Sequence, residues 1–233
     1  MSYGPAVAMP GGPVLRSPNG LATAVTVLLS VVIAADLLAV FADLNMYSLM
    51  GRIVSDGAGA VSQAERDRGD SLNGVSTLLQ ILTLLATAGV FIVWFHRARV
   101  NAEVFAPNAF SKGRGWAIGA WFVPIGNLFL PARIAREIWN ASAQAAPDGS
   151  WRQVSQMPLS RWWSLWIAST VLGRIAGSIY NSAEGADAIR QASAVMSASD
   201  LLDVVSAVCA ILFVRKLSGM QHIKATQGPV ALV

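Results

Sequence analysis

Four long apolar runs with almost no charge dominate the hydropathy pattern of this chain. They are Leu21 to Phe41, Val75 to Phe95, Trp162 to Tyr180 and Val195 to Val214. Each holds about 20 residues, which is the length that an α-helix needs to cross a hydrocarbon core of roughly 30 Å. The pattern therefore predicts an all-α, polytopic helical membrane protein. Its four transmembrane helices are expected at about 21–43, 74–96, 162–181 and 194–214.

A fifth apolar stretch, Trp116 to Leu130, is too short for a fifth helix of the same kind. As a helix its roughly 15 residues would cover only about 22 Å, and Pro124 interrupts its hydrogen bonding near the middle. The pattern favours a re-entrant or interfacial segment over residues 116–131. A protein with five complete spans is the alternative.

The charges of the loops predict how the spans are oriented. Residues 42–71 carry three basic and five acidic residues, and residues 181–200 carry one basic and three acidic residues. Residues 96–115, in contrast, carry four basic residues and one acidic residue. Because cytoplasmic loops keep an excess of Lys and Arg, we expect both termini on the cytoplasmic side of the cell membrane.

The remaining segments divide the chain further. Residues 1–20 are rich in Pro, Gly and Ser, which predicts a disordered tail. A single membrane domain is expected over 21–217, followed by a C-terminal tail over 218–233. A cleaved signal peptide is the alternative for the first apolar run, but that run continues to Phe41, which favours an uncleaved span.

Composition narrows the classes of function. Hydrophobic residues make up 54% of the chain and charged residues 13%, whereas a soluble domain has roughly 25% charged residues. The net charge of +4 is spread over several loops, so no nucleic-acid partner is expected. Cys209 is the only cysteine, and His96 and His222 lie far apart. We therefore expect no metal site, no cofactor and no catalytic residues, and no enzymatic activity.

Two charges within the predicted spans need a partner. Arg174 lies 12 residues after Trp162, and Asp203 lies 12 residues before Arg215. Both side chains are then expected at the same depth, where an unpaired charge costs at least about 2.5 kcal/mol. We predict an intramembrane ion pair of Arg174 with Asp203. The alternatives are a proton or ion relay that also uses Asp36 or Asp200, and an Arg174 side chain that reaches outward to the interface.

Small residues recur every fourth position in the third long run, at Ser169, Gly173 and Gly177. Such a face lets another helix approach closely. The partner is either another helix of the same chain or a second copy of the chain.

The central part of the chain holds two dense motifs. They read WFHRARVN from Trp94 to Asn101 and WAIGAWFVPIGNLFLPARIAREIW from Trp116 to Trp139. In the second motif, Pro124, Asn127 and Pro131 predict a bent apolar loop with Asn127 at its tip. Asn127 then either braces the bend or contacts a ligand.

An amphipathic helix is expected after this bend, over residues 132–146. Arg133 and Glu137 are spaced to form a surface ion pair on that helix. Trp94, Trp116, Trp121 and Trp139 belong to a group of tryptophans that bracket the centre, which is typical of a membrane interface.

These two motifs resemble the bacterial membrane proteins catalogued as domain of unknown function 4328, which are common in actinobacteria. The resemblance implies an integral membrane location and no established activity. The positions that it singles out are Trp94, Arg97, Asn101, Trp116, Trp121, Pro124, Asn127, Pro131, Arg133, Glu137 and Trp139.

Two hypotheses of function follow from the sequence. The first is a non-enzymatic scaffold, regulatory protein, or sensor of lipid or of a partner. The second is a small oligomeric transporter or channel that uses the bend from Pro124 to Pro131 and the intramembrane charges. The expected partners are the lipid bilayer and either another copy of the chain or another membrane protein.

Overall fold

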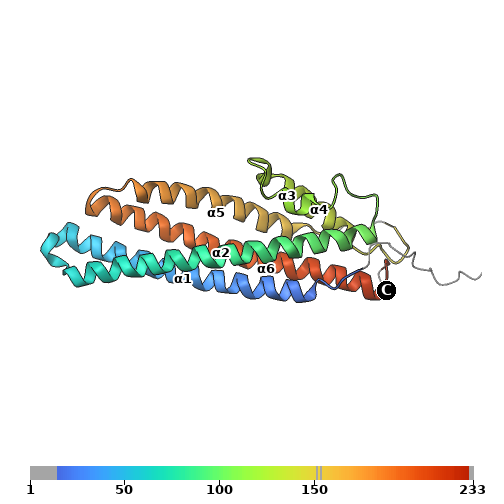
Figure 1. Cartoon of the computed structure of the whole chain (residues 1–233), viewed down its shortest axis with the longest axis horizontal. Coiled ribbons are helices and arrows are strands. Elements are labelled where there is room, and N and C mark those ends of the chain that lie inside the picture. Colours follow the sequence, from blue (N-terminus) through green and yellow to red (C-terminus); the bar gives the residue numbers. More distant parts are fainter. Residues whose placement is uncertain (1–14, 151, 153, 231–233) are drawn as a thin grey trace, which may run out of the picture. The chain divides into compact units, whose positions relative to one another are not determined.

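Four long helices make up most of the chain (Figure 1). The computed structural model describes residues 15–150, 152 and 154–230. The long helices are α1 (Asn19–Asp56), α2 (Gln63–Phe105), α5 (Met157–Asn181) and α6 (Gly185–Gln227). The short elements are η1 (Ala58–Ala60), α3 (Trp116–Gly119), η2 (Gly126–Leu128) and α4 (Leu130–Ser142). The prediction of an all-α fold is confirmed.

The chain divides into two units. We call residues 21–92 and 155–216 the span unit, and the described part of residues 1–20, 93–154 and 217–233 the motif unit. The sequence predicted one domain over 21–217 instead. The difference arises because α2 and α6 continue past the predicted spans and contribute residues to both units. Of the predicted N-terminal tail, residues 1–14 lie outside the described residues, and α1 begins at Asn19.

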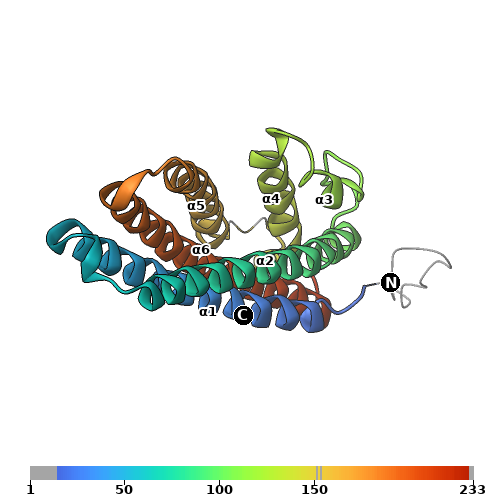
Figure 2. The same cartoon turned by 60° about the vertical axis from the view of Figure 1, so that its left-hand side comes forward.

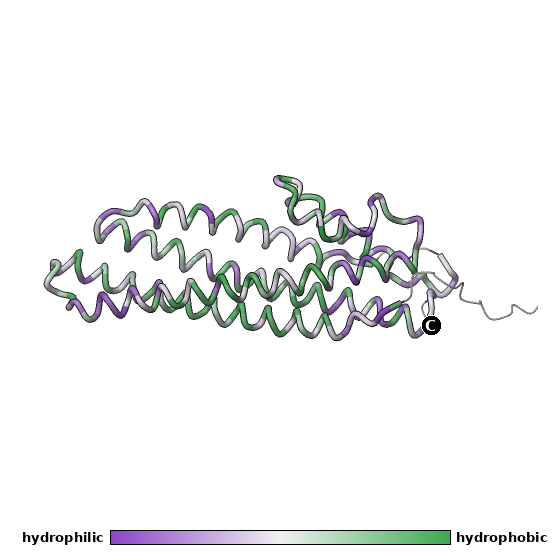
Figure 3. The backbone as a smooth tube through the Cα atoms, in the orientation of Figure 1, coloured by the Kyte–Doolittle hydropathy of each residue, from purple (hydrophilic) through white to green (hydrophobic). Residues whose placement is uncertain are grey.

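Three helices, α1, α2 and α6, are long and apolar enough to cross a membrane. Each contains one of the predicted spans. Figure 3 shows the change of character along α2, whose first turns are polar and whose middle turns are apolar. Because a helix satisfies its own backbone hydrogen bonds, such runs are stable in hydrocarbon.

The remaining predicted span, 162–181, lies in α5 but does not have the same apolar character. Helix α5 has 25 residues, so it is about 37 Å long and could reach across a bilayer. Its tryptophans, its serines and Arg174 lower its mean hydropathy. A fourth span in α5 therefore stays a prediction.

Aromatic packing fixes α5 within the span unit. The ring of Trp162 stacks on Phe213 of α6, with centroids 4.6 Å apart and planes 10° from parallel. Phe91 of α2 lies 5.5 Å from the same tryptophan ring. Each such pair adds roughly 0.5 to 1.5 kcal/mol to the contact of the helices. Trp162 thus joins three helices of this unit.

The turn between α1 and α2 is stabilised by a capping box. The Ser62 Oγ accepts a hydrogen bond from the backbone N–H of Glu65 at 3.3 Å, and the Glu65 carboxylate accepts one from the backbone N–H of Ser62 at 2.9 Å. The backbone N–H groups of Ser62 and Glu65, which have no partner within the helix, are satisfied in this way. Arg52 of α1 pairs with Glu65 at 2.7 Å, so the same carboxylate also joins the two helices.

The two helical hairpins of the span unit turn at the same end of that unit. Figures 1 and 2 show the α1–α2 turn and the α5–α6 turn close to one another. Gly57 and Gly185 supply the left-handed backbone of these turns, with φ of 87° and 82°.

The end of the chain in the motif unit is not the tail that the sequence predicted over 218–233. Helix α6 continues to Gln227, and its Leu217 and Gln221 are buried. Beyond the helix, the Ala145 N–H donates to the Pro229 carbonyl at 2.8 Å. The buried side chains explain the difference, because they give this end of α6 contacts that a tail lacks; residues 231–233 lie outside the described residues.

Helix α4 lies where the sequence predicts an amphipathic helix, with its bounds at 130–142 in place of 132–146. Ile134 and Ile138 are buried, whereas Arg133 and Arg136 are exposed. The Lys224 Nζ donates to the carbonyls of Ala141 at 2.8 Å and Ala143 at 2.6 Å, at the C-terminal end of α4. Cations are favourable there because the last carbonyls of a helix have no partner within it.

The segment between α2 and α4 has no helix of spanning length. It holds only α3, of four residues, and η2, of three residues. The backbone of Ile125 has φ of 61°, which is a left-handed conformation that a β-branched residue rarely adopts. The predicted bend is therefore present, although its depth in a membrane stays a prediction.

Replacing the buried Gln221 by alanine is expected to destabilise the motif unit. Its Nε2 donates to the Ala98 carbonyl at 2.8 Å and to Ser142 Oγ at 3.1 Å, and its Oε1 accepts from Asn101 at 3.3 Å. Gln221→Ala removes three partners from buried polar groups and should lower the free energy of unfolding by about 2 to 4 kcal/mol. Thermal unfolding in detergent, followed by circular dichroism, measures the effect.

The control is Gln227→Ala in the last turn of α6, where the side chain is exposed. It should leave the unfolding temperature unchanged. Equal effects of the two variants would contradict the role assigned to Gln221.

Candidate functional site

Polar side chains from three helices meet inside the span unit. The Gln80 Nε2 of α2 donates to Asp36 Oδ1 of α1 at 3.0 Å and to Asp200 Oδ1 of α6 at 3.1 Å. Asp36 and Asp200 are only 5% and 6% exposed. A primary amide has two hydrogens, so Gln80 satisfies one oxygen of each carboxyl group and ties the three helices together.

Two further carboxyl groups lie in the same region. Asp43 lies beside Asp200, and Asp203 lies near Ser169 of α5, whose hydroxyl donates to the Trp166 carbonyl at 3.1 Å. We call Asp36, Asp43, Asp200 and Asp203 the carboxyl cluster. A hydrogen bond between two carboxyl groups requires a proton on one of them, because an ionised carboxylate can only accept.

No cation offsets these carboxyl groups among the described residues. The charged neighbours of Asp36 are Asp200 and Asp203. The predicted ion pair of Arg174 with Asp203 is not among the four ion pairs of the described part of the chain, and the Arg174 side chain is exposed. The prediction was wrong because equal distance from the helix ends fixes the depth of a residue but not the direction in which its side chain points.

The cluster retains unused hydrogen-bonding capacity. The Oδ2 atoms of Asp36 and Asp43 are buried, and no N–H or O–H of the described residues donates to them. Tyr180 of α5 lies near Asp43 and near the side chain of Asn73. No group of three or more His, Cys, Asp or Glu in the described chain is arranged to hold a metal ion. The chemistry that this arrangement can perform is the binding and release of protons.

The small-residue face of α5 is used within the chain at two of its three positions. Ser169 is buried, and a Cβ placed on Gly173 would lie 3.4 Å from Ser199 Oγ of α6. Gly177 has no atom within 4 Å of such a Cβ. Packing of α5 on α6 explains Ser169 and Gly173 without a second copy of the chain.

In the motif unit, the first motif supplies a buried polar network. The Trp94 indole N–H donates to Ser218 Oγ at 3.0 Å. Asn101 binds the backbone of Arg16 through two hydrogen bonds, at 3.1 Å and 2.8 Å, and Gln221 through a third. Trp94 and Asn101 are thus structural residues that fasten α2 to α6 and to the segment before α1. Arg97 of the same motif is partly exposed.

Arg99 organises the start of the loop after α2. Its guanidinium pairs with Glu103 at 2.8 Å, donates to the Lys112 carbonyl at 2.9 Å and lies 3.5 Å from the Phe110 ring centroid. Glu103 also pairs with Arg114 at 2.8 Å. Hydrogen bonds from Arg114 and then Arg99 hold the pKa of Glu103 below its usual range.

The second motif is partly buried and partly exposed. Trp121 packs edge to face on Phe95, with centroids 5.7 Å apart, and the Trp116 ring lies 4.4 Å from Lys112 Nζ. Pro124 is exposed, and Asn127 lies within η2 and is partly buried. Around these two residues the chain exposes three large apolar side chains: Phe122 at 73%, Ile125 at 76% and Phe129 at 65%.

The part of the second motif in α4 packs in the motif unit. Pro131 and Trp139 are buried. The predicted pair of Arg133 with Glu137 is present at 3.6 Å, on a side of α4 where Arg133 is largely exposed. Ser111 Oγ donates to Glu137 Oε1 at 2.6 Å and so joins the loop after α2 to α4.

Sequence reasoning missed Gln80, Asp43, Ser218 and Gln221. Of these residues, Gln80 has the clearest signal in the sequence, since it is a strongly polar residue within the apolar run from Val75 to Phe95. A polar residue in such a run needs a partner from another helix. Asp36 and Asp200 were named only as additional members of a relay, and the structure brings both of them to Gln80.

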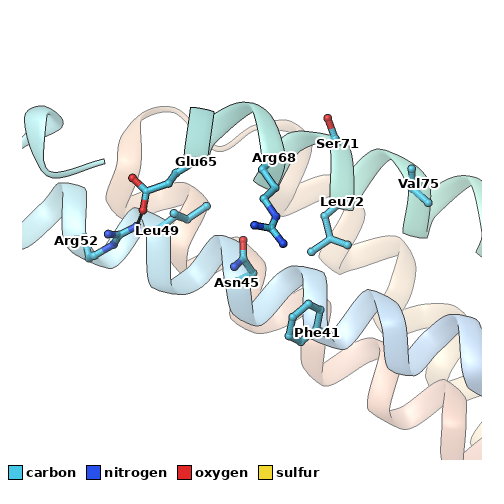
Figure 4. A pocket seen from close by; sticks show the side chains of 9 residues that line it. All are labelled: Phe41, Asn45, Leu49, Arg52, Glu65, Arg68, Ser71, Leu72 and Val75. Atoms are coloured by element: carbon cyan, nitrogen blue, oxygen red, sulfur yellow. Dashed lines mark hydrogen bonds and ion pairs between the residues drawn. The ribbon is translucent and has the colours of Figure 1, made fainter. Parts of the chain in front are cut away.

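A separate cleft of about 620 Å³ opens between α1 and α2 within the span unit (Figure 4). Arg52, Glu65 and Arg68 line it together with Asn45 and apolar side chains. Figure 4 shows Arg68 reaching from α2 toward Asn45 of α1.

The comparisons with known proteins give one match. No curated protein and no solved structure matches the chain. A family model described as "Domain of unknown function (DUF4328)" matches residues 58–219, which include α2, α4, α5 and most of α6. The match covers both motifs and two of the four carboxyl groups of the cluster. The chain therefore belongs to the DUF4328 family, whose function is unknown.

Proposed function

We propose that this protein is a non-enzymatic, multi-pass protein of the bacterial cell membrane that binds protons at the carboxyl cluster and acts as a sensor or regulatory protein. The observation that supports this proposal is the contact of Asp43 with Asp200, held beside Gln80 between helices of spanning character. Ionisable residues within membrane helices are costly, so they mark functional sites by default.

Proton binding at this cluster changes the packing of the helices. With a proton between them, the carboxyl groups of Asp43 and Asp200 attract each other and hold α1 against α6. Without it, two like charges face each other in a region of low dielectric constant, where their repulsion is strong. The helices must then shift, or the carboxyl groups must turn toward water. Such a two-state element can report a proton gradient or a change of local pH.

The orientation that we propose has four spans with both termini in the cytoplasm. The charges of the loops support it, and so do the two hairpin turns at one end of the span unit (Figure 1). We count α5 as the fourth span because its 25 residues are long enough to cross a bilayer and because Trp162 packs it against Phe91 of α2 and Phe213 of α6.

We place the segment 116–131 at the membrane interface. Phe122, Ile125 and Phe129 are apolar and exposed, so they need lipid or a partner to cover them. Lys112 over the Trp116 ring combines a cation with an aromatic side chain, as is common at the level of lipid head groups. In this position the segment can sense lipid or a membrane partner.

A small oligomeric transporter or channel is the second candidate. The unused Oδ2 atoms of Asp36 and Asp43 favour it, because a proton that moves along a path needs successive acceptors. Four spans are few for a monomeric carrier, so this function requires several copies of the chain.

Asp43→Asn is expected to remove a protonated carboxyl group from the folded protein. The wild-type protein in lipid nanodiscs should show the infrared C=O band of a protonated carboxyl at neutral pH. Asparagine can still donate to Asp200, so the variant should fold while that band loses intensity. Titration of the band with pH, followed by infrared difference spectroscopy, measures the effect.

The matched control is Asp56→Asn, at the exposed end of the same helix, which should leave the band as it is. A band that persists unchanged in Asp43→Asn would refute proton sharing at this site, and so would its absence from the wild-type protein.

Proton flux separates a sensor from a transporter. Proteoliposomes with a pH-sensitive dye inside and a pH step outside should acidify no faster than protein-free vesicles if the protein is a sensor. Flux that Asp36→Asn abolishes would instead establish the second candidate.

A cysteine at Ile125 is expected to lie in contact with lipid. In a Cys209→Ala background, Ile125→Cys in proteoliposomes should react slowly with a membrane-impermeant maleimide, because head groups and acyl chains cover it. If a nitroxide is attached to this cysteine, a lipid-soluble relaxation agent should broaden its electron paramagnetic resonance signal. Asn140→Cys, on the exposed face of α4, is the control that should react quickly. Equally fast labelling of Ile125→Cys would place the segment in water.

A further inference from the structure

The cleft between α1 and α2 has one polar end and one apolar end. On α1, Phe41 and Asn45 lie one turn apart on the same face. On α2, Arg68, Leu72 and Val75 follow each other at the spacing of one helix face. The two faces together form a cleft whose polar groups come first along α2 and whose apolar groups continue into the predicted span (Figure 4).

Arg68 is a cation without an ion-pair partner among the described residues. The other two arginines near it are used: Arg52 pairs with Glu65 at 2.7 Å, and Arg66 donates to the carbonyls of Ala58 and Val61. Glu65 does not compete for Arg68. Hydrogen bonds from Arg52 and then Ser62 lower the pKa of Glu65 to about 2, so its charge is already engaged.

The apolar end of the cleft is open to its surroundings. Phe41 is 60% exposed and Val75 is 54% exposed, and both belong to the predicted spans. Exposed apolar side chains of this size in a spanning helix face acyl chains. A molecule that fills the cleft therefore meets a cation and an amide at one end and hydrocarbon at the other.

We propose that this cleft binds an anionic phospholipid of the surrounding membrane. Its phosphate accepts hydrogen bonds from the Arg68 guanidinium, whose planar donors match phosphate oxygens, and from the Asn45 amide. One acyl chain lies along Phe41, Leu72 and Val75. A volume of about 620 Å³ accommodates a phosphate-containing head group and the first part of a chain.

The charges of the cleft select an anionic lipid over a zwitterionic one. A choline or ethanolamine head group carries a cation that needs a carboxylate, and the carboxylate that lines the cleft, Glu65, is already paired with Arg52. The apolar wall selects a lipid over a soluble anion, because inorganic phosphate would leave Phe41 and Val75 uncovered. The proposal involves no residue of the carboxyl cluster and is independent of proton binding there.

Native mass spectrometry of the detergent-purified protein tests the proposal. The protein is titrated with phosphatidylglycerol, with phosphatidylcholine of the same chains, and with inorganic phosphate. Arg68→Gln should weaken binding of phosphatidylglycerol by at least about tenfold, as expected for the loss of a charged hydrogen-bonding partner. Phe41→Ser should weaken it as well, because the acyl chain loses its wall.

Arg174→Gln is the matched control, since Arg174 is also an exposed arginine of the span unit but lies outside the cleft. It should bind phosphatidylglycerol as the wild-type protein does. Arg68→Gln and Arg174→Gln should both keep the unfolding temperature of the wild-type protein, because neither arginine has an ion-pair partner in the described chain.

Four results would overturn the proposal. Arg68→Gln could bind as tightly as the wild-type protein, or Arg174→Gln could lose as much affinity, which would indicate general attraction of anions. Phosphatidylcholine could bind as well as phosphatidylglycerol. Inorganic phosphate could displace the lipid at equal concentration, which would identify a site for a soluble anion.

Discussion

The span unit depends on one constraint, which is that polar groups inside a membrane protein must find their partners within the protein. Gln80 meets this constraint for two carboxyl groups at once, since its Nε2 donates to Asp36 and to Asp200. These bonds also set the rotation of α1, α2 and α6 about their axes, because any other rotation would expose a carboxyl group to hydrocarbon. Under the proposed function, the same constraint makes Asp43 and Asp200 share a proton, because no cation of the described residues lies beside them.

The motif unit obeys the same rule with different groups. Gln221 and Asn101 there satisfy backbone carbonyls and each other, and no charge is involved in their contact. The two buried networks therefore differ in their chemistry. A neutral amide network has one state at all accessible pH values and gives rigidity. A network of carboxyl groups changes its charge with each proton that it binds or releases, and this is why the proposed response to pH is assigned to the span unit.

The elements of the fold could be predicted because they follow from hydropathy and from turn residues. The runs that begin at Leu21 and Val75 are long and carry almost no charge, and Arg133 and Arg136 lie on the exposed side of α4. Side-chain partners could not be predicted in the same way. The position of Arg174 along its helix gave its depth, but its direction depends on how α5 rotates against α6. Gln221 lay in a stretch without apolar periodicity, so nothing local indicated that it would be buried.

The way in which the motif unit is assembled has a consequence for its biogenesis. Its network joins Arg16, Asn101 and Gln221, and the bonds of Asn101 span 85 and 120 residues of sequence. A ribosome delivers Asn101 85 residues after Arg16, and Gln221 a further 120 residues later. The unit therefore cannot complete its hydrogen bonds before the last part of α6 has been synthesised. Until then the Asn101 amide lacks Gln221 as a partner. The incomplete unit thus has an unsatisfied amide group, which costs free energy if it is buried away from water.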